Sequence, residues 1–380
     1  MELQEINRRI RQGQTRSSKG MVIERPLSAA LASSDGRYLY PIEDGMYFLM
    51  ADLAIDTAAD DTCQASTAGD TSRDVRTFYE EIGWQQESDV YADAALFEDL
   101  RPVTEQYRHH CNRRINQHLA KRGNYLVDAA SGPIQYRDYM DFSEGYDIRI
   151  CVDFSQRALR EVKRKLGAAA LCILADVTNL PLKDGCADAA ISLHTIYHVP
   201  RHQQGTAFRE LHRVLRSDGV GIVVYSWGAS FPVRVVQLPL TMRNKVVRGI
   251  QRLKKISGPG PGERPEVATL YFAPFKYRWF ASQEWPFRYD VVTWRSLSIP
   301  ALRAYFPDSP RGRRMLKAVE IVEDRFPHLC GRWGQYPLIV IRGGPVTKRD
   351  EGRDRGGRGT GGEGSAYPLS PGGADEPGRR

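Results

Sequence analysis

Short apolar runs alternate with amphipathic stretches through the middle of the chain. Five of these runs are almost continuous in apolar residues: Tyr125–Val127, Ile148–Val152, Ala170–Ala175, Ala187–Ser192 and Val220–Ser226. Parallel strands that are covered on both faces have this composition. The segments between them place apolar residues at helical spacing, so the pattern predicts strands that alternate with helices. Such alternation indicates an α/β fold with a parallel sheet and helices on both faces.

The alternation is interrupted after the fifth run. Residues 228–285 contain a basic amphipathic segment, a Gly/Pro-rich loop and an aromatic stretch, and we interpret them as a cap inserted after the fifth strand. A basic amphipathic helix that lies on a membrane surface is the alternative. A sixth strand at 288–298, an amphipathic helix around Val319 and a last strand at Tyr336–Arg342 complete a predicted seven-stranded, Rossmann-like sheet.

The ends of the chain have a different character from the middle. Asp-Gly turn signals between short apolar runs predict a small β-rich module near the N-terminus. The final segment is rich in Gly, Arg and Pro and lacks the apolar content needed to fold. The predicted organisation is an arm at 1–20, the β-rich module at 21–50, a linker at 51–75, a helical lead-in at 76–121 and a disordered tail at 345–380.

Composition narrows the class of protein. The net charge of +8 is modest for 380 residues, so nucleic acid is a possible but not a favoured partner. None of the six cysteines forms a C-x-x-C pair, which predicts neither a metal site nor a disulfide framework. The N-terminal residues lack an apolar signal region, and no apolar stretch is long enough to span a bilayer. We therefore expect a soluble, cytoplasmic protein.

The first strand of the sheet leads into a turn with chemical character. The stretch YLVDAASGPIQY ends an apolar run with Asp128 and continues through small residues to Gly132, and Pro133 is predicted to begin a helix. Ligands bind at the carboxyl ends of strands in open α/β sheets. Two further acids, Asp153 and Asp176, end the next two strands. Any one of the three acids could simply cap a helix or close a turn. That explanation does not account for an acid at the end of all three consecutive strands.

These acids favour one kind of cofactor. An acid in the position of Asp153 can accept both hydroxyls of a ribose. A nicotinamide dinucleotide would prefer a G-x-G-x-x-G turn, because its pyrophosphate needs close backbone approach. This turn has one glycine and begins with Asp128, which would repel a pyrophosphate and attract an ammonium or sulfonium group. The pattern therefore predicts a positively charged nucleoside cofactor without phosphates.

Several stretches in order resemble the class I S-adenosylmethionine-dependent methyltransferases over roughly residues 116–344. The segment VDAASGPI is similar to the family's glycine-rich first motif, with Ala130 and Ile134 at two positions where the family has glycine. ADVTNLPLKDGCADAAIS and ELHRVLRSDGVGIVVYS match later blocks of the family. The resemblance implies a methyltransferase domain at 76–344 and S-adenosyl-L-methionine as its cofactor. The cofactor-binding residues it implies are Asp128, Ala130, Ser131, Gly132, Asp153, Phe154, Asp176, Val177 and Ser192.

A second resemblance concerns the N-terminal module. YPIEDGMYFLM is similar to the end of the zinc-ribbon-derived domain that acts as a methyltransferase activator. The cysteines that hold zinc in those relatives are missing here, since Arg25 precedes Pro26 where a cysteine is expected. An ordinary β-hairpin is the alternative.

The acceptor side is less specific. SLHTIYHVP follows the fourth strand, and we take His194 as the candidate general base because histidine titrates near neutral pH. Packing of His194 against the cofactor is the more ordinary interpretation. The expected function is methyl transfer to a small-molecule acceptor. The alternatives are a catalytically silent binding or scaffold protein, an RNA or protein methyltransferase and, disfavoured by the acidic turn, a nucleotide-dependent oxidoreductase.

Overall fold

The computed structural model describes residues 29–57, 71–87, 90–228 and 270–344, together with the single positions 4 and 7. The predicted tail, most of the predicted arm and the larger part of the predicted cap lie outside the described residues. Within the described ranges, no helix is both long enough and apolar enough to cross a lipid bilayer.

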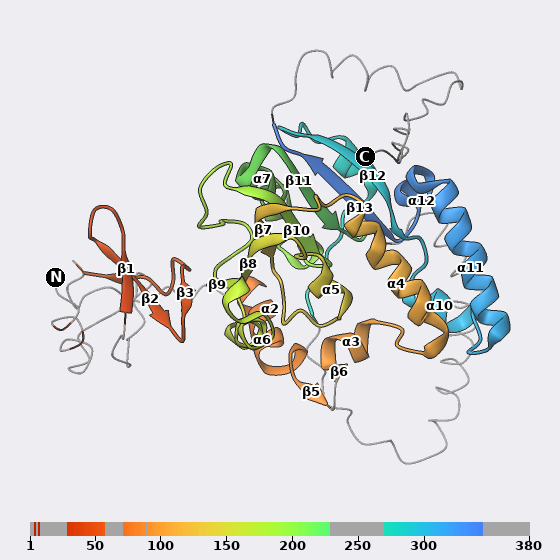
Figure 1. The fold of residues 1–380 in the computed structure, drawn as a ribbon, viewed down its shortest axis with the longest axis horizontal. Coiled ribbons are helices and arrows are strands. Elements are labelled where there is room, and N and C mark those ends of the chain that lie inside the picture. The colour runs from red at the N-terminus through yellow and green to blue at the C-terminus, as the bar shows by residue number, and fades with distance from the viewer. Residues whose placement is uncertain are drawn as a thin grey trace, which may run out of the picture. The chain divides into compact units, whose positions relative to one another are not determined.

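Seven strands form the central sheet, and their order confirms the predicted Rossmann-like α/β fold (Figure 1). The first five in spatial order run parallel, whereas the sixth runs antiparallel to both of its neighbours. The chain adds strands on one side of the third strand in this order and then on its other side. The point where the direction changes is where such sheets bind ligands. The order is β9 (Ala170–Leu174), β8 (Tyr146–Asp153), β7 (Gly123–Ala129), β10 (Ala187–Leu193), β11 (Leu215–Val224), β13 (Tyr336–Arg342) and β12 (Arg288–Arg295).

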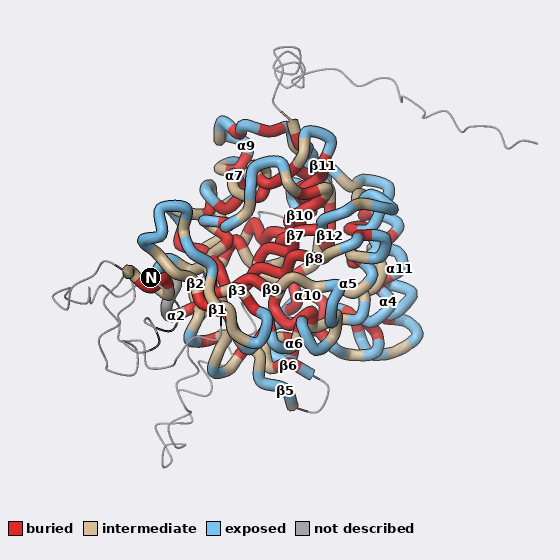
Figure 2. Tube along the Cα trace, turned by 60° about the vertical axis from the view of Figure 1, so that its left-hand side comes forward, coloured by how far each residue is buried: buried red, intermediate tan, exposed pale blue. Residues whose placement is uncertain are grey.

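Two hydrophobic cores lie on the two faces of this sheet. Successive residues of a strand point to opposite faces, so Leu126 packs into one core and Val127 into the other. Figure 2 shows the buried residues concentrated along the strands. The first core includes side chains from α4 (Pro102–Asn116), α6 (Gln156–Leu166), α10 (Ile299–Tyr305) and α11 (Pro310–Arg325), and the second from α7 (Gln204–Val214) and α9 (Tyr277–Ala281).

The lead-in segment at 76–121 was predicted to be helical. In the structure it is instead broken into several short helices and strands. Arg101 is extended, with ψ at 148°, because Pro102 disfavours helical backbone in the residue before it and itself begins α4. The pieces before it are α2 (Thr71–Phe78), a π-helical turn at Tyr79–Gly83, β5 (Gln86–Glu87), β6 (Val90–Tyr91) and α3 (Ala92–Phe97).

The helix predicted to begin at Pro133 is absent. Gly132 and Ile134 have φ angles of 55° and 51°, and this left-handed backbone on both sides of the proline cannot continue a right-handed helix. Only one helical turn, α5 (Asp138–Asp141), lies between β7 and β8. Within the ranges 71–87, 90–228 and 270–344, the remaining helical elements are α12 (Pro327–Trp333) and short 3-10 turns at Gly167–Ala169, Ile196–His198 and Arg201–Gln203.

The predicted N-terminal β-rich module is joined to the central sheet. Its described strands are β1 (Ala29–Ala32), β2 (Tyr38–Glu43) and β3 (Met46–Phe48), and β4 (Ile55–Asp56) lies within the predicted linker. β3 pairs in parallel with the edge strand β9, so the module lengthens the sheet to eleven strands. Met46 and Phe48 lie in the first core of the central sheet. The module is therefore packed as part of the sheet.

Candidate functional site

The turn after β7 has an unusual backbone. Ala130, Gly132 and Ile134 all have positive φ, at 59°, 55° and 51°. Left-handed backbone is strained for residues other than glycine, by roughly 1–2 kcal/mol each. Ala130 and Ile134 are the positions where the resembling family has glycine, so this chain keeps the conformation without the glycines. Strain of this kind is often found at functional sites.

The turn is held against the end of β8. The N–H groups of Ala130 and Ser131 donate to the carbonyl of Val152, at 2.7 and 3.2 Å. The Gly132 N–H donates to Asp153 Oδ2 at 2.8 Å, and the Ser155 N–H donates to Oδ1 of the same carboxylate at 2.8 Å. Burial raises the pKa of Asp153 to about 7, against the lowering effect of these two bonds. Asp153 is thus a buried acid that titrates near neutral pH.

Asp128 does not stand free, because it forms a buried ion pair with Arg149 of β8. The Arg149 Nη2 lies 2.5 Å and its Nε 3.1 Å from Asp128 Oδ2. Burial raises the pKa of Asp128, and the guanidinium works in the opposite direction. The arginine was not among the predicted site residues, although a basic residue inside an otherwise apolar strand was a visible signal.

Asp176 follows β9 and closes its own turn. Its Oδ1 accepts hydrogen bonds from the Thr178 N–H at 2.7 Å and from the Thr178 hydroxyl at 2.8 Å. Phe154 and Val177 supply apolar surface next to the two acids at the strand ends. Polar and apolar groups therefore alternate along the ends of β8 and β9.

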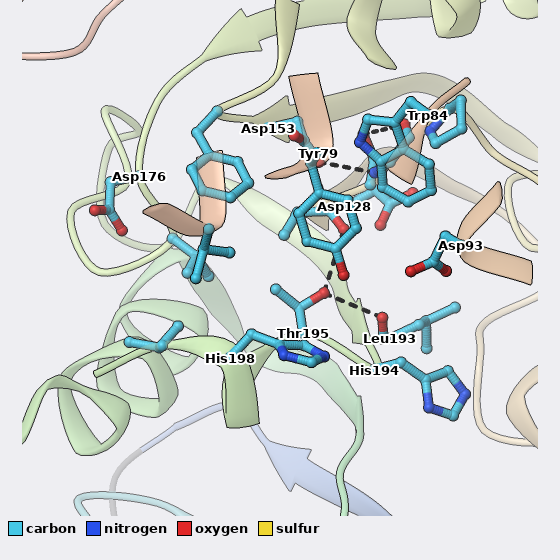
Figure 3. Close-up of a pocket in the computed structure, with 18 of the residues that line it drawn as sticks. Tyr79, Trp84, Asp93, Asp128, Asp153, Asp176, Leu193, His194, Thr195 and His198 are labelled. Carbon is cyan, nitrogen blue, oxygen red and sulfur yellow. Dashed lines mark hydrogen bonds between the residues drawn. The ribbon is translucent and has the colours of Figure 1, made fainter. Parts of the chain in front are cut away.

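One cavity collects almost all of the predicted cofactor residues at the carboxyl ends of β7 to β10 (Figure 3). Ser192 is the exception, since it is fully buried within β10 and does not line the cavity. The residues that do line it are Asp128, Ala130, Ser131, Gly132, Asp153, Phe154, Asp176 and Val177, together with the predicted base His194.

Three further cavity residues come from the lead-in segment and were not among the predicted site residues. Tyr79 and Trp84 stack with ring centroids 4.8 Å apart, and both line the cavity with Asp93. A Cβ at Gly132 would lie only 3.0 Å from the Trp84 ring, so the indole closes directly over the turn. The Trp84 indole N–H is buried and has no partner among the described residues. In the sequence, the aromatic residues Tyr79 and Trp84 ahead of the sheet were the feature that could have indicated that this segment covers the turn.

A second cavity of about 440 Å³ adjoins the first. Its walls combine aromatic with charged side chains, and its volume lies in the range of small-molecule sites, roughly 300–1,000 Å³. The residues common to both cavities are Tyr79, Asp93, Gln135, Tyr139, His194 and His198. A molecule in one cavity can therefore meet a molecule in the other at these side chains.

His194 lies at this junction but is a weak base. Its backbone is left-handed, with φ at 61°, and its ring packs edge-on against Trp294 at 4.5 Å. Burial, then the charge of Arg295 and His198, lowers the pKa of His194 to about 3. An imidazole with so low a pKa stays neutral at pH 7 and accepts a proton poorly.

Asp93 is the other acid at the junction and is better matched to proton transfer. It is partly buried, and the Tyr79 hydroxyl and the Gln135 side chain are its hydrogen-bonding neighbours. Burial raises the pKa of Asp93 to about 6, against the lowering effect of these two bonds. A carboxylate that titrates just below neutral pH is ionised at pH 7 and still has appreciable basicity.

Comparison with known proteins agrees with the geometry. Residues 127–223, which include the turn, Asp153, Asp176 and His194, match the family model described as a methyltransferase domain. This match agrees with the predicted methyltransferase-like α/β fold. No curated protein matches the chain, and no comparison supports the resemblance of the N-terminal segment to the zinc-ribbon activator.

Solved structures with a related fold are distant in sequence. A chain from the complex between the Haloferax volcanii Trm112 methyltransferase activator and a putative methyltransferase is 14% identical, with coverage of 64% of this chain and 92% of that one and a TM-score of 0.39. Phosphoethanolamine N-methyltransferase 1 of Haemonchus contortus is 12% identical over 73% and 50%, with a TM-score of 0.44. Geranyl diphosphate C-methyltransferase of Streptomyces coelicolor is 14% identical over 72% and 99%, with a TM-score of 0.41. Likeness at this level assigns no acceptor to the chain.

Proposed function

We propose that the protein is an enzyme that transfers the methyl group of S-adenosyl-L-methionine to a small-molecule acceptor. The observation that carries the proposal is the pair of adjoining cavities. The first lies at the strand ends within a methyltransferase domain, and the second shares six residues with it. Donor and acceptor can therefore be held separately and meet at the junction.

The residues of the first cavity fit the cofactor. The buried Asp153 carboxylate is an acceptor for ribose hydroxyls, and by resemblance Asp176 and Val177 hold the adenine. The unpartnered indole N–H of Trp84 is a donor that a polar ligand group would satisfy. When bound, S-adenosyl-L-methionine supplies a methyl group on a positively charged sulfur, and the acidic site stabilises that charge.

The residues of the junction would align the acceptor and exclude water. Methyl transfer is an in-line displacement, so holding the acceptor atom in line with the methyl group supplies much of the rate. Tyr79 and Trp84 cover the turn, while Tyr139, His194 and His198 separate the two cavities. A base is needed only if the acceptor must lose a proton.

Calorimetric titration with S-adenosyl-L-methionine and S-adenosylhomocysteine tests the cofactor site. We expect binding near micromolar for the intact chain and a loss of about 2–3 kcal/mol for Asp153→Ala, as for a hydrogen bond to a charged group. Asp147→Ala is the matched control, because Asp147 is an exposed acid on the same strand. If folded wild-type protein bound neither compound, the enzyme proposal would be wrong as stated.

A catalytically silent binding protein is the second candidate, and Ala130 and Ile134 in place of glycine are the features that favour it. Against it, both residues adopt the left-handed backbone that glycine would adopt. Transfer of a labelled methyl group to any acceptor decides between the two, since a silent protein would bind the cofactor and form no product.

We also propose a cytoplasmic location. The support is that Cys111, Cys151, Cys172, Cys186 and Cys330 are all unpaired thiols, which is typical of a reducing compartment. A compartment-specific labelling experiment on the native cell tests this directly.

A further inference from the structure

The second cavity has an apolar, aromatic wall. Trp294 and Tyr336 are buried or nearly so at one side, and Tyr197 is buried beside them. Phe97 and Phe272 also line the cavity while remaining about half exposed, at 50% and 53%. Aromatic side chains prefer offset or edge-on contact with another ring. The cavity is therefore suited to a flat, aromatic molecule.

Four arginines surround the loop at Glu98 and Asp99, and two of them are neutralised. Arg295 Nη1 pairs with the Glu98 carboxylate at 2.7 Å. Arg101 pairs with the Asp99 carboxylate at 2.6 Å. These two guanidinium groups have their counter-charges within the protein.

The other two arginines that contact this loop have no carboxylate partner among the described residues, and both line the second cavity. Arg108 Nη1 donates to the Asp99 carbonyl at 3.3 Å, and Arg303 Nη2 donates to the neighbouring Glu98 carbonyl at 2.6 Å. Neither forms an ion pair with a carboxylate in the described ranges. Because adjacent carbonyls hold them, the two guanidinium groups lie on one side of the cavity. Paired guanidinium groups recognise a carboxylate well.

Asp93 is the third feature of the second cavity that bears on the acceptor. It lies where this cavity joins the cofactor site. It lines both cavities, and the Tyr79 hydroxyl and Gln135 are its polar neighbours. Among the described residues, the titratable groups that act on Asp93 are Tyr79, Tyr136, Tyr197 and Glu98, and none of these four is a cation. A carboxylate in this position can take a proton from an acceptor hydroxyl.

We propose that the acceptor is an aromatic hydroxy acid, with its carboxylate bound by Arg108 and Arg303 and its hydroxyl facing Asp93. This inference rests on the proposed methyl transfer. In the reaction the hydroxyl proton passes to the Asp93 carboxylate, and the oxygen lone pair forms the new bond to the methyl carbon. The carbon–sulfur bond breaks with its electron pair moving to sulfur, which leaves neutral S-adenosylhomocysteine and a methyl ether.

The test uses the full chain and three hydroxy acids that differ in length: 4-hydroxybenzoate, 4-hydroxyphenylacetate and 4-hydroxycinnamate. Their methyl esters lack the carboxylate, and their deoxy analogues lack the hydroxyl. Binding is measured by calorimetry with S-adenosylhomocysteine at saturation, and turnover by mass spectrometry with S-adenosyl-L-methionine. We expect at least one acid to bind and to be O-methylated, its ester to bind at least tenfold more weakly, and its deoxy analogue to bind without reacting.

Variants assign the roles. Arg108→Gln with Arg303→Gln should remove the difference between acid and ester while cofactor affinity is unchanged. Arg160→Gln, an exposed arginine on α6, is the control and should keep the difference. Asp93→Asn should keep acid binding and lower turnover at least a hundredfold.

Cofactor titration separates the two proposals. If the cofactor binds but none of the three acids does, or if acid and ester are used equally by wild-type protein, the acceptor inference is overturned and the cofactor site stands. If the cofactor itself does not bind, methyl transfer and the acceptor inference fail together.

Discussion

Single residues in the cofactor turn carry backbone strain that can be measured. Ala130 has φ at 59°, and a glycine there would relieve roughly 1–2 kcal/mol of left-handed strain. Glycine also increases the entropy of the unfolded chain, which offsets about 0.4–1 kcal/mol of that gain. We expect Ala130→Gly to raise the free energy of unfolding slightly, by about 0.5–1 kcal/mol, without weakening cofactor binding.

Ala129→Gly is the matched control for this prediction. Ala129 is the last residue of β7, is fully buried and has ordinary strand backbone. Glycine there should destabilise the protein by at least about 0.5–1 kcal/mol. Denaturant unfolding of both variants gives the comparison, and equal destabilisation of the two would contradict the strain at Ala130.

The buried pair of Asp128 and Arg149 makes the second residue-scale prediction. Arg149→Met leaves the Asp128 carboxylate buried without a partner, and loss of one member of such a pair costs about 3–5 kcal/mol. Asp128→Leu combined with Arg149→Met removes both charges and should restore most of that stability. Urea unfolding of the single and double variants measures the difference. A double variant less stable than the single one would show that the pair itself stabilises the fold.

At this scale the sequence predicted which acids end the strands but not what they contact. Asp128, Asp153 and Asp176 all lie at the predicted strand ends and line one cavity. The partner of Asp128 was missed because Arg149 lies 21 residues away on another strand, and only the sheet register brings the two together. His194 was chosen for its ordinary pKa, whereas burial in the folded protein lowers it.

At the scale of elements, one buried acid joins α4, α11 and the segment after β12. Glu323 Oε1 accepts hydrogen bonds from the Tyr107 hydroxyl at 2.8 Å and the Ser296 N–H at 2.7 Å. Its Oε2 accepts from Arg114 Nη1 at 2.8 Å. Arg108 of α4 lines the second cavity, so the network fixes the position of that part of the cavity wall.

Glu323→Ala should therefore be strongly destabilising. It leaves the buried Arg114 without its inner counter-charge, and the expected loss is about 3–5 kcal/mol in the free energy of unfolding. Asp324→Ala is the control, because Asp324 also contacts Arg114 but is 49% exposed and should contribute at most about 1 kcal/mol. Similar losses for both variants in thermal unfolding would show that burial of Glu323 does not decide its contribution.

Most strands of the central sheet could be predicted, but the attachment of the N-terminal hairpin could not. Apolar runs locate β7 to β11 because each run is a local signal of burial on both faces. The parallel pairing of β3 with β9 joins residues more than a hundred positions apart, such as Tyr47 and Ile173, and no local pattern encodes it. The missed break at Pro133 has a similar cause, since the hydrogen bonds to β8 help to hold the turn before it.

For the molecule as a whole, the charge of the cofactor site changes near neutral pH. Asp153 and Asp93 have pKa values raised to about 7 and about 6, mainly by burial. A carboxyl whose pKa is raised by folding stabilises the fold below its unfolded pKa, and this contribution is lost as pH rises through the folded pKa. With these pKa values, both carboxyl groups are neutral in mildly acidic solution and negative above pH 7. The Asp128 and Arg149 ion pair adds no net charge.

This change of charge predicts how the protein distinguishes the cofactor from its product. S-adenosyl-L-methionine carries a positive sulfur, whereas S-adenosylhomocysteine does not, so ionisation of Asp153 and Asp93 should favour the former selectively. We expect the ratio of their affinities to rise about tenfold between pH 5.5 and pH 8, as nearby charges at an intermediate dielectric interact by more than 1 kcal/mol. The affinities of both compounds are measured by calorimetry at each pH. Their ratio removes any effect of pH that is common to both compounds, such as an effect on ribose binding, adenine binding or the fold. Asp93→Asn should flatten the part of the rise near pH 6 and leave the part near pH 7. A ratio that stays constant across this range would mean that neither carboxylate acts on the sulfonium charge, and Asp153 would then contribute only its hydrogen bonds.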